Sequence, residues 1–250
     1  LTYVFDSFDI CPILTFSSPL PGCGKTTSLE VLTTLVPRPL PTSNLSPSVV
    51  YRGIEKYRPV LLLDEADSFM TEDAESLRGI INSGHRRSTA VVLRNEKVGD
   101  SIEPKAFSTW TPKAIAAIGD LPATVRARSV IIQMRRRTKG EKVERLRFDK
   151  LIAEVEPLRR KLARWAQDSK AVLALAEPVL PDGIDSDRAA DNWRVLCAIA
   201  DNAGGLWPAD ARKAALELCR VKDTDTPADS VQMLSDIRDI FENQPNTKMS

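Results

Sequence analysis

The chain contains 250 residues, carries a net charge of +1, and has 42% apolar and 28% charged residues. These values are ordinary for a soluble globular protein, and the length allows one large domain or two small ones with a sizeable core. The near-neutral balance excludes a chain that binds nucleic acid through its overall charge, so any basic surface must be local.

The cysteine and histidine content argues against two kinds of structural site. The chain has one histidine, His85, and four cysteines without a C-x-x-C pair, Cys11, Cys23, Cys197 and Cys219. This inventory disfavours a structural zinc site and a disulfide framework, and it suits a reducing cytoplasm.

No apolar run approaches the ~18–20 residues of a membrane span, and we find no signal peptide. We therefore expect a cytoplasmic protein with no membrane contact, and, because it begins with Leu1, a piece of a longer chain.

Residues 1–148 alternate between predicted strands and helices. Short apolar or β-branched runs bounded by Pro, Gly or Ser predict strands at Ile13–Phe16, Leu40–Leu45, Val60–Leu63, Ala90–Leu93, Ala106–Trp110 and Ser129–Met134. Between them we expect helices over Lys25–Leu35, Pro47–Lys56, Ala74–Ser83 and Lys113–Ile118. The alternation predicts an α/β fold whose mostly parallel sheet is sandwiched by helices.

After Phe148 the pattern becomes helical. Pro157 suits a first helical position, and Leu158, Leu162 and Trp165 then recur at helical spacing. Further helices are expected over Arg188–Ala203, from Pro208 onward, and over Val231–Phe241, with a loop at Glu177–Gly183. We therefore expect a core over residues 1–148 and, over residues 149–250, an all-helical lid followed by the start of a C-terminal helical segment.

A glycine-rich segment, Pro21-Gly22-Cys23-Gly24-Lys25-Thr26-Thr27, predicts a loop that cradles phosphates. Glycines let the backbone turn tightly, and successive N–H groups then point at an anion beside the positive end of the following helix. Lys25 would contact the β- and γ-phosphates of ATP, and the Thr26 hydroxyl would be a ligand of Mg²⁺.

A second motif follows the apolar strand Val60–Leu63. Asp64 would hold Mg²⁺, and Glu65 would orient and deprotonate the attacking water. A glycine turn before a helix, or an Asp-Glu pair at a strand end, also occurs without this function, and Pro19 stands where the strict phosphate-loop pattern has glycine. The two motifs in this order, with Lys25 and Asp64 separated by 64 − 25 = 39 residues, favour an ATPase.

These motifs closely resemble the AAA-plus ATPases, in which a nucleotide-binding core precedes a helical lid. A narrower resemblance, to an uncharacterised family of ATPases of phages, plasmids and integrated elements, involves Ser46-Pro47, Leu61–Asp67, Asn82–Arg87, Pro112–Ala116, Ile118-Gly119, Arg128-Ser129 and Arg188–Trp193. Members of that family often follow a primase-like region. The resemblance implies ATP and Mg²⁺ as cofactors and a homo-oligomeric ring such as a hexamer. It also implies DNA as a partner, and single-stranded DNA is one candidate.

The superfamily resemblance also implies three further groups. A polar sensor follows the strand next to the phosphate loop, for which we nominate Thr111; the alternative is that Thr111 caps the next helix. An arginine finger that reaches a neighbouring subunit fits Arg128, and Arg126 is the alternative residue. The non-functional alternative is that Arg128 forms a structural ion pair at the surface. A second sensor arginine in the lid fits Arg188, with Arg194 as the fallback.

Three basic segments are candidates for contact with DNA. They are His85-Arg86-Arg87, the segment Arg94–Lys105 interpreted as a hairpin, and the run Arg135–Arg147, each of which would otherwise be a solvated turn or loop. A DNA-linked, helicase-like motor is the leading hypothesis. The alternatives are a protein-remodelling or regulatory ATPase that ignores DNA, and a monomeric phosphotransferase.

Overall fold

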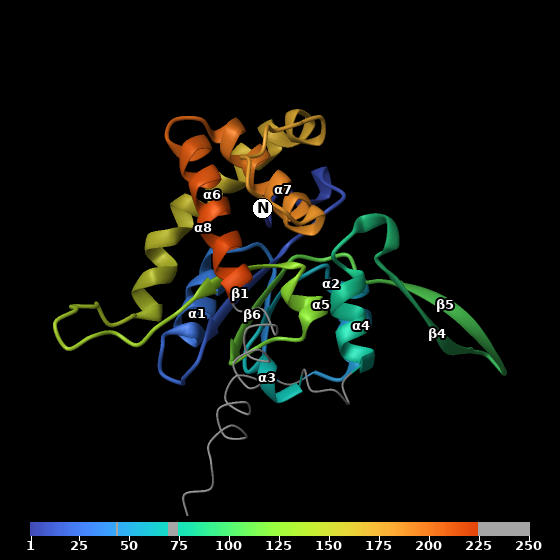
Figure 1. Ribbon diagram of the computed structural model, residues 1–250. Coiled ribbons are helices and arrows are strands. Elements are labelled where there is room, and N and C mark those ends of the chain that lie inside the picture. The colour runs from blue at the N-terminus through green and yellow to red at the C-terminus, as the bar shows by residue number, and fades with distance from the viewer. Residues whose placement is uncertain (44, 70–74, 225–250) are drawn as a thin grey trace, which may run out of the picture.

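A five-stranded parallel sheet forms the centre of the protein. The computed structural model describes residues 1–43, 45–69 and 75–224, and its sheet has the strand order β2-β3-β6-β1-β7 (Figure 1). All neighbouring strands pair in parallel, so their carboxyl ends share one edge of the sheet. The strands are β1 (Ile13–Ser18), β2 (Pro39–Thr42), β3 (Val60–Leu63), β6 (Lys113–Ile118) and β7 (Ser129–Gln133).

Helices cover both faces of this sheet, as the sequence predicted. On one face, Leu29 and Val36 of the α1 region pack on Leu62 and Ala116. On the other, α2, α4 and α5 pack against the opposite side chains of β3 and β6. The four helices are α1 (Lys25–Leu35), α2 (Pro47–Tyr57), α4 (Glu75–Ser83) and α5 (Ala123–Arg126), and a short α3 (Ala66–Phe69) follows β3. Every residue of β3 is buried, which explains its uninterrupted apolar sequence.

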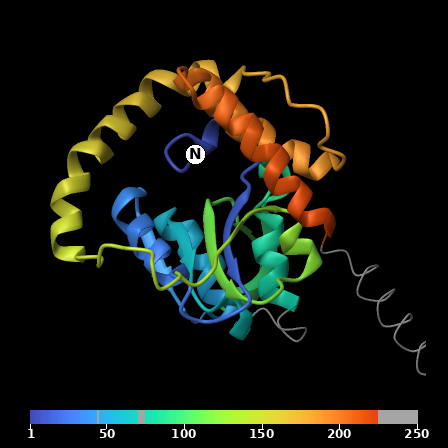
Figure 2. The same ribbon diagram turned by 60° about the vertical axis from the view of Figure 1, so that its left-hand side comes forward.

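Three longer helices follow the core. They are α6 (Phe148–Ala174), α7 (Asp187–Ala203) and α8 (Trp207–Thr224). Trp193 of α7 and Ala215 of α8 pack with Val130 at the edge of the sheet, while Val4 packs with Ala166 and Ala198. Figure 2 shows α6 arching away from the sheet and α8 running back toward it.

Strands β4 (Val91–Val98) and β5 (Ser101–Ser108) form an antiparallel hairpin outside the main sheet. The hairpin projects from the core in Figure 1, with Gly99 in a left-handed conformation at its turn. The hairpin expected around Arg94–Lys105 is therefore confirmed. The predicted strand Ala106–Trp110 is wrong as a member of the main sheet, because its first three residues belong to β5.

The predicted helix over Lys113–Ile118 is also wrong, because these residues form β6. Its alanines favour a helix when considered locally. In the structure, however, β6 lies between β1 and β3, where its backbone groups pair on both sides and all residues from Lys113 to Ala117 are buried. Tertiary pairing therefore overrides local propensity at this position.

Two predictions in the helical region have different outcomes. Pro157 does not open a helix, since it lies inside α6, which already begins at Phe148. The predicted helices from Arg188 and Pro208 are confirmed, as α7 and α8 each begin one residue earlier. The predicted helix Val231–Phe241 lies outside the described residues. Among the helices that the structure describes, none combines the length and apolar character that crossing a membrane requires.

Gly84, which directly follows α4, tests the close packing of this region. A Cβ at this position would lie 2.1 Å from the backbone oxygen of Thr109 and 2.5 Å from Lys113 Nζ. We expect Gly84→Ala to lower the free energy of unfolding by about 2–3 kcal/mol, because the backbone must shift. The control is Gly79→Ala in α4, where a Cβ would meet no atom within 4 Å. This substitution should stabilise the helix by about 0.5–1 kcal/mol. Urea unfolding measures both, and equal effects of the two substitutions would contradict this packing.

Candidate functional site

The two sequence motifs meet in one cavity at the carboxyl edge of the sheet. The cavity has a volume of about 300 Å³ and lies between the glycine loop (Pro21–Thr27) and the acidic residues that follow β3. Its lining comprises all seven residues of the glycine loop together with Asp64, Glu65, Asp67, Ala116 and Ile118. Parallel pairing explains the meeting, because β1 and β3 deliver the residues that follow them to the same edge.

Two left-handed glycines shape the loop. Gly22 has φ 76° and Gly24 has φ 86°, and Gly24 directly precedes the first residue of α1. Residues with a Cβ rarely adopt this backbone, which is why both positions require glycine. Since the first amides of a helix lack partners within it, they can bind an anion held in this loop.

Lys25 is buried at the base of the loop. Its Nζ donates to Ser18 Oγ at 2.5 Å and to the Leu20 carbonyl oxygen at 3.5 Å, and the residue is only 8% exposed. Both of these acceptors are neutral, and an anion in the loop would offer a stronger one. Thr26 and Thr27 follow in the first turn of α1 and are exposed, so the Thr26 hydroxyl is accessible from the cavity.

Asp64 and Glu65 lie where β3 ends. The Asp64 amide donates to the Thr42 carbonyl oxygen at 2.9 Å, and the Glu65 amide donates to Asp64 Oδ1 at 2.9 Å. Asp64 is half-buried and Glu65 is exposed. Carboxylate and hydroxyl oxygens are the ligands that Mg²⁺ prefers, so the donor set of Asp64 and Thr26 fits such an ion.

Glu65 has a left-handed backbone, with φ 53°. This conformation is uncommon for a residue with a long side chain, and such strain is concentrated at functional sites. Glu65 is therefore held in the cavity by a backbone geometry that the sequence motif alone did not reveal.

The end of β6 completes the cavity. The Ile118 amide donates to Asp67 Oδ1 at 2.9 Å, and the Gly119 amide donates to the Ser18 carbonyl oxygen at 3.0 Å. These bonds tie β6 to the segments that follow β3 and β1. Sequence reasoning missed Asp67, Ser18 and Ile118 as part of the site; the short apolar run between Pro112 and Gly119 was the available signal for a strand here.

Thr111 is not near this cavity, so its nomination as the sensor is wrong. Its hydroxyl is buried and donates to the Pro59 carbonyl oxygen, just before β3 begins. Thr111 therefore lies at the amino edge of the sheet, while the glycine loop lies at the carboxyl edge. It also caps no helix, because β6 follows it.

Arg188 is likewise not beside the glycine loop of its own chain. It lines a second cavity, of about 660 Å³, with Arg128, which directly precedes β7 at the amino edge. The structure therefore does not bring Arg188, expected as the second sensor, into the cavity beside the glycine loop. Burial lowers the pKa of Arg128, and the nearby charge of Arg188 lowers it further. The two guanidinium groups thus face a shared space in which a negative charge would be stabilised.

The His85-Arg86-Arg87 cluster is engaged within the protein. His85 is buried and its Nε2 lies 2.7 Å from Asn192 Oδ1, while Asn192 Nδ2 donates to the Ala127 carbonyl oxygen at 3.2 Å. Burial lowers the pKa of His85, and the hydrogen bond with Asn192 opposes this effect. These contacts dock α7 on the core, which explains the lone histidine.

The two arginines of this cluster form ion pairs. Arg86 bridges Asp9 and Asp191 at 3.0 and 2.9 Å, and Arg87 pairs with Asp6 at 3.2 Å. The cluster thus connects the N-terminal segment, the core and α7. All three of its side chains have partners within the protein, so a role in holding these parts together explains each of them.

The basic run Arg135–Arg147 lies against the glycine loop. Arg136 Nε donates to the Pro21 carbonyl oxygen at 3.0 Å, and Met134 lies beside Gly24. A cavity of about 950 Å³ lies beside this contact and is lined by residues of the loop and of the run, together with Glu30. Arg135 is paired with Glu141 at 2.5 Å, and this bond lowers the pKa of the Glu141 carboxyl to about 2. The run therefore borders the candidate site, which its charge alone did not indicate.

Comparisons with known proteins extend to part of the chain. A family model described as a protein of unknown function, DUF3631, matches residues 133–250, from the end of β7 onward. An uncharacterized 28.9 kDa protein in the xis 5′ region of Saccharopolyspora erythraea is 39% identical over 113 residues. That similarity covers 45% of this chain and 42% of the length of the relative.

The left-handed backbone at Glu65 predicts a measurable gain in stability on substitution. Glycine adopts this conformation without strain, so we expect Glu65→Gly to raise the free energy of unfolding by about 1 kcal/mol. The control is Glu30→Gly, on the exposed side of α1, which should lower it by about 1 kcal/mol. Thermal and urea unfolding measure both variants. A loss of stability in Glu65→Gly equal to that of the control would contradict the presence of strain.

Proposed function

We propose that the protein is a Mg²⁺-dependent ATPase whose active site is the cavity beside the glycine loop. One observation carries the proposal: Lys25 and the adjacent pair Asp64 and Glu65, which lies far from Lys25 in sequence, line the same cavity at the carboxyl edge of a parallel sheet. In open α/β sheets this edge is where ligands bind. The resemblance of both motifs to AAA-plus ATPases points the same way.

The residues of the cavity suggest how ATP would be bound. The amides of Gly22, Cys23 and Gly24 and the start of α1 would hold the phosphates, and Lys25 would exchange its bond to Ser18 for the β- and γ-phosphate oxygens. Asp64 and Thr26 would hold Mg²⁺, which when bound would neutralise charge on the phosphates.

Glu65 is the residue proposed to prepare the attacking water. Its side chain is exposed and lines the cavity next to Asp64, so its carboxylate can accept a proton from a water molecule there. Asp67, by contrast, accepts the Ile118 amide at 2.9 Å and serves to position the end of β6. This division assigns a separate role to each of the three acidic residues.

An oligomer is the arrangement that gives Arg128 a role. Arg128 lies at the amino edge of the sheet, in a cavity that shares no residue with the candidate active site. It could stabilise transferred phosphate only on a neighbouring copy of the chain, as an arginine finger does. We therefore propose a homo-oligomer, with a ring as the form that the resemblance implies.

A DNA-linked role in a mobile element is our proposal for the larger context. The Saccharopolyspora relative is named for its position beside xis, which denotes an excisionase gene, and this supports an association with an integrated element. The second candidate is a protein-remodelling or regulatory ATPase with the same active site. Stimulation of ATP turnover by single-stranded DNA at low salt would favour the motor, whereas nucleotide-dependent assembly that ignores DNA would favour the second candidate.

Two substitutions separate nucleotide binding from hydrolysis. We expect Lys25→Ala to weaken ATP binding by at least about tenfold, because a buried charge-assisted contact to phosphate is lost. Glu65→Gln should bind ATP as the wild type does and hydrolyse it at least about 100-fold more slowly, since the carboxylate that accepts the proton is gone. Fluorescent-nucleotide titration and phosphate release measure the two steps. Wild-type hydrolysis by Glu65→Gln would remove Glu65 from its proposed role.

Subunit mixing tests the position of Arg128. Arg128→Ala keeps its own Glu65, while Glu65→Gln keeps its own Arg128, so a mixed oligomer contains interfaces with both groups intact. We expect the mixture to hydrolyse ATP faster than either variant alone. Its turnover, as a fraction of the wild-type turnover, should reach at most the fraction of interfaces in which both groups are intact. Arg160→Ala, on the exposed surface of α6, is a charge-matched control that should keep wild-type turnover. A mixture no faster than its components would place Arg128 outside a shared site.

A further inference from the structure

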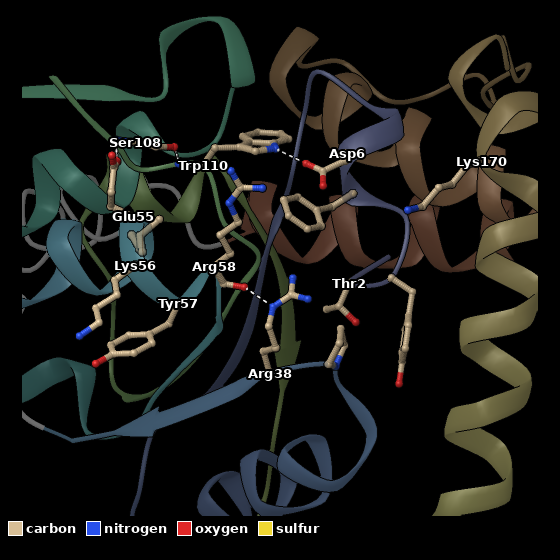
Figure 3. A pocket seen from close by; sticks show the side chains of 14 residues that line it. Thr2, Asp6, Arg38, Glu55, Lys56, Tyr57, Arg58, Ser108, Trp110 and Lys170 are labelled. Atoms are coloured by element: carbon tan, nitrogen blue, oxygen red, sulfur yellow. Dashed lines mark hydrogen bonds between the residues drawn. The ribbon is translucent and has the colours of Figure 1, made fainter.

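A basic cavity at the amino edge of the sheet is separate from the proposed active site. It has a volume of about 840 Å³ and is shown in Figure 3. Arg38 directly precedes β2, Arg58 lies just before β3, and Trp110 lies just before β6, so all three stand at the amino ends of their strands. Lys170 of α6 and the N-terminal segment form the opposite wall. The glycine loop lies at the other edge of the same strands.

Two arginines of this cavity have a left-handed backbone. Arg38 has φ 47° and Arg58 has φ 43°, two of the three left-handed residues other than glycine among the described residues. Arg38 Nε donates to the Arg58 carbonyl oxygen at 2.7 Å, a bond drawn in Figure 3. Arg58 is the C-cap of α2, and its amide donates to the Ile54 carbonyl oxygen at 2.9 Å. The third left-handed residue other than glycine is Glu65, in the proposed active site.

The cavity has an excess of positive charge. Its charged lining consists of four cations, Arg38, Lys56, Arg58 and Lys170, and two carboxylates, Asp6 and Glu55, a difference of 4 − 2 = 2. Both carboxylates are already occupied: Asp6 accepts from Trp110 Nε1 at 3.1 Å and pairs with Arg87, and Glu55 accepts the Ser108 amide at 3.0 Å. Within the part of the chain that the structure describes, none of the four cations forms an ion pair.

Aromatic side chains accompany these cations. Tyr57, between Lys56 and Arg58, is 57% exposed, and the Trp110 ring forms part of the lining. Trp110 is half-buried against Phe5, and Lys56 Nζ lies 5.1 Å from the centre of the Tyr57 ring. Cations without ion pairs beside an exposed ring form a surface that single-stranded nucleic acid binds, because the cations contact phosphates and the ring stacks with a base. A recessed cavity suits a flexible strand, whereas reading a duplex requires an element that enters a groove.

We propose that this cavity binds the phosphodiester backbone of single-stranded DNA, with Arg38 and Arg58 as the phosphate contacts and Tyr57 as a stacking surface. The choice of DNA rests on the DNA-linked part of the proposed function. The site lies across the sheet from the glycine loop, so strand and ATP would occupy opposite edges of the same parallel sheet. β2 and β3, which begin at the arginines, end beside Asp64 and thus connect the two edges directly.

The test uses a fluorescently labelled 20-nucleotide oligothymidylate and the full chain, by anisotropy between 50 and 200 mM salt. The variant is Arg38→Asn with Arg58→Asn, because asparagine tolerates the left-handed backbone while removing the charge. We expect its affinity at 50 mM salt to fall about tenfold, and the slope of log affinity against log salt to shrink by about 1.4, which is 0.7 for each of two lost phosphate contacts.

The matched control is Arg160→Gln with Arg164→Gln, which removes the same charge from the exposed surface of α6. It should leave both affinity and slope unchanged. Equal binding by the Asn variant and the wild type overturns the proposal, as does the absence of binding by the wild type at 50 mM salt. Displacement of the oligonucleotide by free ATP in the Lys25→Ala background also overturns it, since the cavity would then take a mononucleotide.

ATP binding and turnover are read separately in the same variants. If Lys25 governs ATP turnover but the Asn variant binds DNA normally, the amino-edge site is wrong and the ATPase stands. If substitution of Lys25 and Glu65 changes neither ATP binding nor ATP turnover while the Asn variant binds DNA more weakly, the proposed ATPase site is wrong and the DNA site stands.

Discussion

Parallel pairing of β1, β6 and β3 is the constraint on which the rest of the structure depends. Main-chain hydrogen bonds fix the register of these strands, so Ser18 aligns with Ile118, and Leu63 aligns with Ile115. The segments after the three strands then converge at one edge, where the Gly119 amide bonds to Ser18 and the Ile118 amide bonds to Asp67. Without that register, the glycine loop and the carboxylates of Asp64 and Glu65 would be unrelated surface groups.

The same pairing gives the sheet two chemically different edges. The carboxyl edge holds a small cavity in which Lys25 is buried and left-handed backbone occurs at Gly22, Gly24 and Glu65. The amino edge holds two larger cavities rich in arginine. β3 is buried throughout and β6 is buried from Lys113 to Ala117, so these two strands connect the edges through the interior of the protein.

The helical region is attached to the core through polar as well as apolar contacts. Asn192 joins His85 to the Ala127 backbone, and Arg86 joins Asp9 to Asp191, so α7 is docked close to Arg128. Trp193 adds an apolar contact on the edge strand β7. The position of Arg128 and Arg188 thus depends on the packing of α7, and the arginine cavity exists only when the helical region is docked. Buried hydrogen bonds of this kind favour one specific arrangement over several similar ones.

The sequence by itself determined the elements whose signals are local. Apolar runs located β1, β3 and β7, helical periodicity located α1, α2, α7 and α8, and the two motifs identified the residues that share the carboxyl-edge cavity. Only the tertiary structure decided the rest. The alanines of β6 favour a helix until two neighbouring strands pair with them, and Thr111 and Arg188 could not be assigned to an edge before strand order was known. The left-handed backbones of Arg38, Arg58 and Glu65 were not predicted, because a pattern of residue types does not fix the backbone dihedral angle at a single position.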